Sequence, residues 1–341
     1  MFRFLYVERA LRDHPRVERI RRRFASATVI ECERYQEVFN PRAQEFRLQK
    51  GAPALLLARK TGHLLLPIPA GYGIGSSRNV YFSHLLNCIY DCRYCFLQGM
   101  YRSANLVLFV NYEDFGEAID KQITDAPDTH FFSGYDCDSL ALDNVTGFCD
   151  FILPHFSRRQ GLLELRTKSV QINSLRRHEA LPNCVVAFSF TPQSISDVVE
   201  AGVPSVARRI AAARTLAERG WPIGLRFDPL IWSPDSLAEY EALFATLFSA
   251  LPEAAIHSVS LGPFRLPAKM FKTILGLYPE ERLFAFGLAR QGRMVTYEAE
   301  RGEKLLDEVR QALLRHIGRE RLFECAEAGD FGLTSPSIAI Q

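Results

Sequence analysis

The sequence predicts an α/β protein whose centre is a partial (β/α)6 barrel, and three observations support this fold class. From Asn79 onward, short runs rich in β-branched and aromatic residues alternate with stretches of helical periodicity. That alternation is typical of βα units around a parallel sheet. Six such strand-like runs occur before residue 265. Polar residues follow the runs directly, at the positions where parallel barrels carry their active sites.

We expect three parts along the chain. Residues 1–75 form an N-terminal α/β extension, residues 76–282 the partial barrel, and residues 283–341 a C-terminal β-hairpin plus a helix. In the extension, Phe4 to Val7 are expected to form a strand, and residues 15–24 a helix whose arginines face solvent. The glycine-rich stretch from Gly71 to Ser77 predicts a loop.

Each barrel element is predicted from its own pattern. Strands are expected at residues 79–84, 129–134, 162–168, 185–190, 223–231 and 257–264. Helices are expected at residues 112–121, 142–155, 174–178, 194–201, 204–219, 234–250 and 269–277. In the C-terminal part, residues 284–297 predict a hairpin that turns at Gln291 and Gly292. Residues 302–317 predict an amphipathic helix with its leucines on one face.

The composition predicts a cytoplasmic protein without membrane attachment. Hydrophobic residues make up 48% of the chain and charged residues 23%, as in ordinary globular proteins with a sizeable core. The net charge of +2 neither requires nor excludes a nucleic-acid partner. Outside one group of three, the 8 cysteines are scattered singly, which does not favour a disulfide framework. We see no signal peptide and no apolar run long enough to cross a bilayer.

The sequence is organised around a cysteine loop from Asn87 to Gln98. Cys88, Cys92 and Cys95 follow the spacing C-x3-C-x2-C. Three thiolates can bind three corners of a [4Fe–4S] cluster, which leaves one iron open, as in catalytic metal sites. The alternative is a structural zinc site, with His84 or Cys137 as the fourth ligand. We favour the cluster, because zinc sites usually contain C-x2-C pairs.

With Tyr94 before the third cysteine, the loop has the form C-x3-C-x-aromatic-C and resembles that of the radical S-adenosylmethionine (SAM) enzymes. The resemblance implies a [4Fe–4S] cluster and SAM as cofactors, on a partial barrel of the radical SAM type. It also implies that SAM is cleaved to a 5′-deoxyadenosyl radical, which abstracts a hydrogen atom from the substrate. The protein then positions the cofactors and excludes water.

Beyond that loop, the chain from about Val80 to Glu300 resembles the spore photoproduct lyase family, which reverts a methylene-bridged thymine dimer in DNA. The loop continues as C-x-L-Q, and shorter matches follow on several strands. These matches are Phe131, Asp138, Asp143, Thr146, Thr167, Lys168, Phe188, Ser189, Arg265, Tyr278 and Pro279.

The resemblance implies roles for individual residues. Cys88, Cys92 and Cys95 would ligate the cluster, and Tyr94 would lie beside SAM. SAM would also be contacted by Asp138, Lys168 and Ser189. Arg265 would contact the lesion or a phosphate. The alternatives are a helix N-cap for the aspartate, an exposed lysine, an ordinary strand serine, and a surface salt bridge for the arginine.

Two positions depart from the family pattern. Tyr135 stands where the family has the cysteine that returns a hydrogen atom to the thymine radical, and Cys137 follows two residues later. Phe96 stands where the family has a tyrosine. Cys137 or Tyr135 could therefore be the donor, or the substrate could differ. Cys137 could also be a plain buried cysteine.

The predicted partners are damaged DNA and a low-potential electron donor of the flavodoxin or ferredoxin type, while the oligomeric state is left open. Basic residues near Arg265 and on the hairpin are interleaved with aromatic residues, which is typical of nucleic-acid surfaces; the alternative is an ordinary solvated surface. The aromatic residues are Phe264, Phe271, Phe284, Phe286 and Tyr297. Three hypotheses result: a C–C-bond-cleaving lyase for DNA lesions, a radical SAM enzyme with another substrate, and a non-catalytic zinc-containing nucleic-acid-binding protein.

Overall fold

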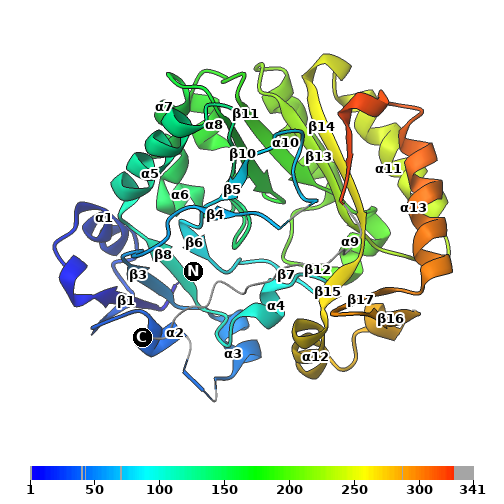
Figure 1. The fold of residues 1–341 in the computed structure, drawn as a ribbon. Coiled ribbons are helices and arrows are strands. Elements are labelled where there is room, and N and C mark those ends of the chain that lie inside the picture. The colour runs from blue at the N-terminus through cyan, green and yellow to red at the C-terminus, as the bar shows by residue number, and fades with distance from the viewer. Residues whose placement is uncertain (1, 40, 43, 70, 286, 326–341) are drawn as a thin grey trace.

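The core of the protein is a curved eight-stranded sheet (Figure 1). The computed structural model describes residues 2–39, 41–42, 44–69, 71–285 and 287–325. All neighbouring strands in this sheet are parallel except the β4–β5 pair. The order is β18 (Leu322–Glu324), β14 (Ile256–Pro263), β13 (Ile223–Leu230), β11 (Cys184–Ser189), β10 (Leu162–Thr167), β9 (His130–Phe132), β5 (Asn79–Tyr81) and β4 (Leu66–Pro67).

The six predicted barrel strands lie side by side in this sheet, in chain order, so the predicted partial barrel is confirmed. Strand β11 is buried at every position, as expected for a parallel strand covered on both faces. The helices between the strands cover the outside of the curve (Figure 1). They are α5 (Tyr112–Asp125), α7 (Phe148–Phe156), α8 (Asn173–Arg177), α10 (Val206–Ala217), α11 (Ser236–Ala250) and α13 (Ala299–Leu313).

The helix predicted at residues 142–155 is broken in the structure. It consists of α6 (Asp143–Thr146) and α7, and Gly147 between them has a φ of 62°. A left-handed residue ends one helix and redirects the chain into the next, and glycine adopts this conformation without a Cβ penalty. The sequence pattern missed the break because the apolar periodicity continues across it.

A second sheet forms the N-terminal part of the molecule. Its order is β2 (Thr28–Cys32), β1 (Phe4–Glu8), β3 (Leu55–Ala58), β8 (Leu106–Phe109) and β6 (Leu85–Leu86). The short helices are α1 (Pro15–Arg23), α2 (Gln36–Phe39) and α3 (Phe46–Gly51). Because β6 and β8 lie beyond residue 75, the chain returns to this sheet after it has started the barrel. The three predicted domains remain predictions.

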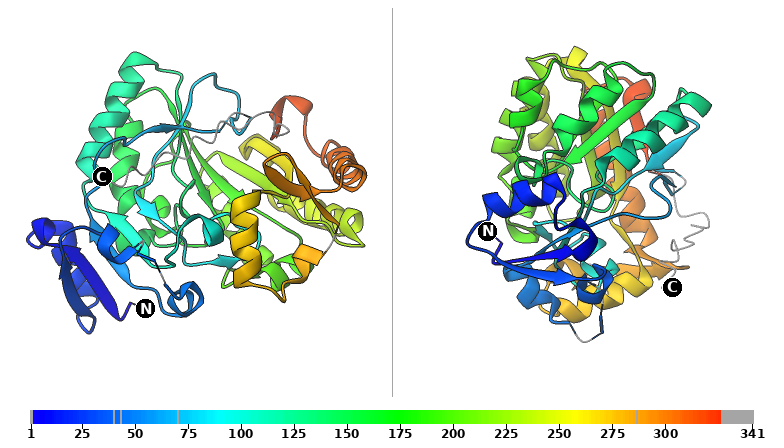
Figure 2. Two further views of the ribbon diagram at one scale, coloured as in Figure 1. Left: turned by 60° about the horizontal axis from the view of Figure 1, so that its bottom comes forward. Right: turned by 90° about the vertical axis from the view of Figure 1, so that its left-hand side faces the viewer.

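The C-terminal part contains the predicted hairpin, formed by β16 (Leu288–Gln291) and β17 (Met294–Tyr297). Strand β17 also pairs with β15 (Arg265–Pro267), which leads into α12 (Ala268–Leu277). The predicted closing helix is α13, and the chain then adds β18 to the edge of the barrel sheet. Figures 1 and 2 show this hairpin and the N-terminal sheet on opposite sides of the barrel. None of the helices in the described ranges has the length and apolarity that crossing a membrane requires.

Candidate active site

The cysteine loop connects β6 to α4 (Leu97–Met100) and is fixed at its start by Asn87. Asn87 has a φ of 67°, and its buried amide donates hydrogen bonds to the carbonyls of Ser103 at 2.8 Å and Asn105 at 2.7 Å. An asparagine tolerates this left-handed conformation better than most residues. The loop therefore leaves the N-terminal sheet in a defined direction, with Cys88 as its next residue.

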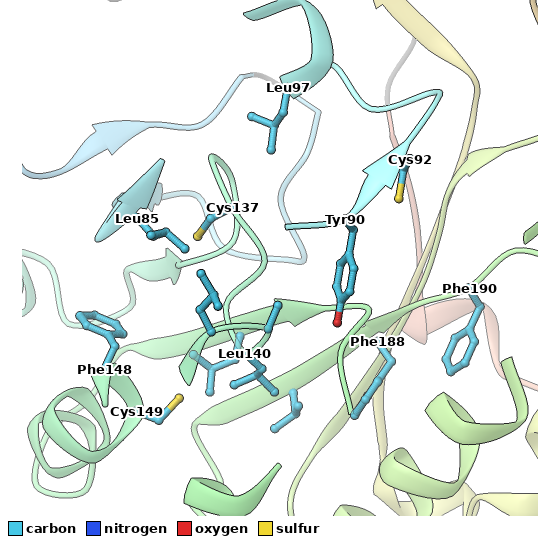
Figure 3. Packing of buried hydrophobic residues seen from close by; sticks show 14 of the residues in the cluster. Leu85, Tyr90, Cys92, Leu97, Cys137, Leu140, Phe148, Cys149, Phe188 and Phe190 are labelled. Atoms are coloured by element: carbon cyan, nitrogen blue, oxygen red, sulfur yellow. The ribbon is translucent and has the colours of Figure 1, made fainter. Parts of the chain in front are cut away.

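The middle of the loop is tied to the barrel by backbone pairing. Cys92 lies in β7 (Asp91–Cys92), which runs antiparallel to β12 (Glu200–Ala201). The amide of Arg93 also donates to the carbonyl of Val199 at 2.8 Å. Figure 3 shows Cys92 on this short strand, with Tyr90 just before it. The position of Cys92 is thus set by the end of α9 (Gln193–Val199).

The three loop cysteines are free thiols. Burial raises the pKa of the Cys88 thiol to about 12, and it raises the pKa values of Cys92 and Cys95 as well. Such thiols ionise when they coordinate a metal. In the described part of the chain, no three His, Cys, Asp or Glu side chains are grouped tightly enough for a single metal ion. Three free thiols on one loop are the donor set of three corners of a [4Fe–4S] cluster, so these residues fit that group.

Glu200 is the centre of the polar network beside the cysteine loop, and sequence reasoning missed it. The Tyr94 hydroxyl donates to its carboxylate, and the remaining hydrogen bonds come from Thr191 at 2.9 Å, Ser196 at 2.6 Å and Arg209 at 2.8 Å. Burial alone would raise the pKa of Glu200, but the charges of Lys168 and Arg209 outweigh it and lower this pKa to about 2. The carboxylate is therefore ionised at neutral pH.

The predicted SAM residues converge on this carboxylate. The ammonium nitrogen of Lys168 lies 3.5 Å from the Glu200 carboxylate and 5.5 Å from the centre of the Tyr94 ring. The guanidinium of Arg209 donates to the carbonyl of Ser189 at 2.8 Å, which fixes the end of β11. The structure thus brings together Tyr94, Lys168 and Ser189 from three separate elements.

Asp138 contacts this group through the protein backbone. Its carboxylate accepts hydrogen bonds from the Lys168 amide at 2.6 Å and the Thr167 hydroxyl at 2.7 Å. The amides of Leu140 and Ala141 donate to it at 3.0 and 2.8 Å. Both carboxylate oxygens therefore have protein partners. This arrangement resembles the predicted N-cap alternative, and it holds Lys168 at the end of β10.

The two candidate hydrogen donors lie on the loop after β9. The Tyr135 ring stacks on Tyr81, with centroids 4.4 Å apart, and lies 5.5 Å from the ring of Phe96 in the cysteine loop. Cys137 is buried in the apolar core (Figure 3). Burial raises the pKa of its thiol, and the nearby Asp138 and Cys88 raise it further. Both candidates are thus close to the cysteine loop.

Arg265 lies in a half-buried polar pocket rather than in a surface salt bridge. Its Nε donates to the Tyr72 hydroxyl at 2.8 Å, and the guanidinium carbon lies 4.9 Å from the centre of the Tyr72 ring. Asp228 is nearby and accepts a hydrogen bond from the Cys325 thiol at 3.0 Å. A cavity of about 10 Å³ is lined by Tyr72, Asp228 and Cys325, together with Arg166.

The predicted stacking surface near Arg265 is wrong for two of its aromatic residues. Phe264 and Tyr297 are fully buried, and the Tyr297 hydroxyl accepts a hydrogen bond from the Trp232 amide at 2.8 Å. Phe271 and Phe284 pack edge to face against each other, with centroids 5.3 Å apart. Phe286 lies outside the described residues. The sequence shows that aromatic residues recur here, but not that they pack into the core.

Comparison with known proteins decides the family. Residues 81–320 match the family model described as spore photoproduct lyase. The chain belongs to the spore photoproduct lyase family. The predicted resemblance, from about Val80 to Glu300, is thereby confirmed.

Relatives in this family agree with the fold. A spore photoproduct lyase from Bacillus subtilis (strain 168) is 27% identical over 222 residues. The match takes in 61% of this chain and 65% of the relative, slightly less than two thirds of the relative's length. A spore photoproduct lyase variant with bound AdoMet and dinucleoside spore photoproduct superposes with a TM-score of 0.80 at 20% identity. The enzyme complexed with dinucleoside spore photoproduct gives 0.78 at 19%. Both structural matches cover 96% of this chain and 98% of the other.

Proposed function

We propose that this protein is a radical SAM lyase that repairs a thymine-dimer-type lesion of the spore photoproduct kind in DNA. The observation that carries the proposal is the link between the cysteine loop and the polar network, through the pairing of Cys92 with Glu200. One carboxylate gathers Tyr94 and Lys168 beside three free thiols. Family membership and the ligands named for the two solved relatives support the same substrate.

The cofactor contacts follow from this arrangement. Cys88, Cys92 and Cys95 hold a [4Fe–4S] cluster, which together with SAM supplies a 5′-deoxyadenosyl radical when both are bound. The ammonium group of Lys168 binds the SAM carboxylate, and its distance of 5.5 Å from the centre of the Tyr94 ring supports a shared site for the two residues. Asp138 fixes the backbone of Lys168. Arg209 fixes the end of β11 through the carbonyl of Ser189. The burial of Tyr94 and Cys92 keeps water from the reacting groups.

The substrate contacts come from Arg265 and from the loop after β9. Arg265 offers a guanidinium that binds an oxygen of the lesion or its phosphate. Once the C–C bond of the dimer is broken, a hydrogen atom passes to the thymine radical from the thiol of Cys137 or the phenol of Tyr135. That transfer breaks one S–H or O–H bond and forms one C–H bond. A low-potential electron donor of the flavodoxin or ferredoxin type and a cytoplasmic location complete the proposal.

The test is anaerobic incubation of the reduced, reconstituted protein with SAM and dinucleoside spore photoproduct. The proposal predicts recovery of the thymine dinucleoside and cleavage of SAM. A protein in which Cys92 is replaced by alanine is the matched control and should do neither. Failure to recover thymine while SAM is cleaved would favour the second hypothesis, a radical SAM enzyme with another substrate. The differences from the family pattern at Tyr135 and Phe96 are the observations that support this second candidate.

A further inference from the structure

The polar pocket at Arg265 is closed by the glycine-rich loop from Gly71 to Ser77. Gly71 and Gly75 have φ values of 84° and 106°, which glycine adopts without the strain that a side chain adds. A Cβ on Gly73 would lie 2.8 Å from the side chain of Asn79. The loop is therefore built to pass close to β5 and to direct Tyr72, between two glycines, into the cavity.

Tyr72 contacts Arg265 as a bound aromatic ligand would, through both a hydrogen bond and its ring. Its phenol oxygen accepts a hydrogen bond from Nε, while its ring lies beneath the guanidinium. The Nη2 group of Arg265 is buried and has no hydrogen-bond partner among the described residues. Leaving such a donor unpaired costs free energy. A ligand that brings a hydrogen-bond acceptor to this position would therefore be favoured.

The pocket also holds both donors and an acceptor. Arg265 and Arg166 both supply donors near Asp228, and the Arg166 guanidinium lies 3.6 Å from its carboxylate. A planar ring with an N–H between carbonyl oxygens, such as the imide edge of a thymine base, presents the complementary groups. Base edges are recognised by contacts of this kind.

Tyr72 lines the cavity together with Asp228 and Arg166, and a ring of this size does not fit while Tyr72 is in place. The cavity that remains is about 10 Å³, roughly enough for one water molecule. The pocket borders the candidate active site, because Arg166 lines it and packs against Gly134, and the neighbouring Tyr135 ring lies 5.5 Å from that of Phe96. A base bound there would lie next to the cysteine loop.

We propose that Tyr72 is a plug whose phenol ring occupies the place of a pyrimidine base on Arg265, and that substrate binds by displacing the loop from Gly71 to Ser77. The identity of the base rests on the proposed function, whereas the plug rests on the geometry of the loop and pocket. Arg265, Asp228 and Arg166 then form the surface that reads the base edge.

Hydrogen–deuterium exchange of the unmodified protein tests the displacement. Saturating thymidylyl-thymidine dinucleotide should increase amide exchange in residues 71–77, since the ligand expels the loop. Slower or unchanged exchange there would overturn the plug, because the loop would then close over the ligand or play no part. The cytidine dinucleotide, which lacks the imide edge, should produce a smaller change.

Binding of the same dinucleotide to variants tests the competition. Tyr72→Ala should bind about tenfold more tightly than the unmodified protein, the scale of one hydrogen bond to a charged group. Tyr72→Phe, which keeps the ring and loses the oxygen, should show a smaller gain. Tyr6→Phe, a half-buried tyrosine of β1 that does not line the cavity, is the control and should leave affinity unchanged.

Weaker or equal binding by Tyr72→Ala, or binding by none of the proteins, would overturn the plug. The test of the plug is independent of the test of the proposed function, because the exchange and binding measurements need neither the cluster nor SAM. If SAM cleavage fails while Tyr72→Ala gains affinity, only the proposed function fails. If repair succeeds and Tyr72→Ala gains nothing, only the plug fails.

Discussion

Glu200 lies directly opposite Cys92 in the ladder between β7 and β12. The residue that gathers Tyr94, Lys168 and Arg209 is therefore joined by backbone hydrogen bonding to a predicted cluster ligand. A shift of either element therefore moves the thiol together with the side chains predicted to contact SAM. This relationship gives the candidate site its rigidity and makes Glu200 the first residue to test.

Replacing Glu200 with glutamine should destabilise the protein strongly. The change leaves the fully buried Arg209 without its carboxylate partner, and breaking a buried pair in this way costs about 3 kcal/mol or more. Urea-induced unfolding measures the difference. Glu241→Gln removes an exposed partner of Arg315 and should cost less than about 1 kcal/mol. Equal effects from the two substitutions would contradict the central role of Glu200.

The same residue predicts how stability depends on pH. The pKa of Glu200 is lowered to about 2 in the folded protein, against about 4.3 for an ordinary glutamate. Its contribution to stability is therefore complete above pH of about 5 and is lost as the pH falls towards 2. The gap in unfolding free energy between the unmodified protein and Glu200→Gln should therefore narrow between about pH 5 and pH 2. A gap that stays constant would argue against this ionised carboxylate.

Replacing Lys168 with methionine should weaken SAM binding by about tenfold or more, because one charge-assisted contact with the SAM carboxylate is lost. The change is measured by anaerobic equilibrium dialysis of reconstituted protein with labelled SAM. Lys121→Met, on the exposed face of α5, is the matched control. Unaltered SAM affinity in Lys168→Met would remove this lysine from the proposed binding site.

Cys137→Ala and Tyr135→Phe separate the two hydrogen donors. The variant that lacks the true donor should still cleave SAM but should divert the thymine radical to side products, which chromatography of the reaction mixture resolves. Cys184→Ala, at a fully buried cysteine of β11, controls for lost packing and should keep the normal products. If neither single variant changes the products, both candidates are wrong.

The barrel could be predicted from the sequence because its strands are apolar runs separated by amphipathic helices. The cysteine loop could be recognised equally well, because its three predicted ligands lie within eight residues. The N-terminal sheet was harder to predict. Strands β3 and β8 are four residues each, are separated by almost fifty residues, and pair only in the folded chain.

Glu200 and Tyr72 show what the sequence could not supply. Glu200 directly follows α9 and belongs to no motif, and its role depends on Lys168 just after β10, on α10 and on the cysteine loop. Its one local signal is a charged residue directly after the apolar pair Val198 and Val199. Tyr72 lies in a loop whose glycines were recognised, but its contact with Arg265 spans 193 residues. Long-range polar contacts of this kind leave no periodic pattern.

The most direct test of the account is electron paramagnetic resonance of the reduced, anaerobically reconstituted protein, with iron and sulfide analysis of the same sample. The account predicts a [4Fe–4S] cluster whose signal changes when SAM is added, and no cluster after Cys88, Cys92 and Cys95 are all replaced by alanine. A protein without a cluster, a cluster that survives the triple substitution, or a signal that SAM leaves unchanged would contradict it.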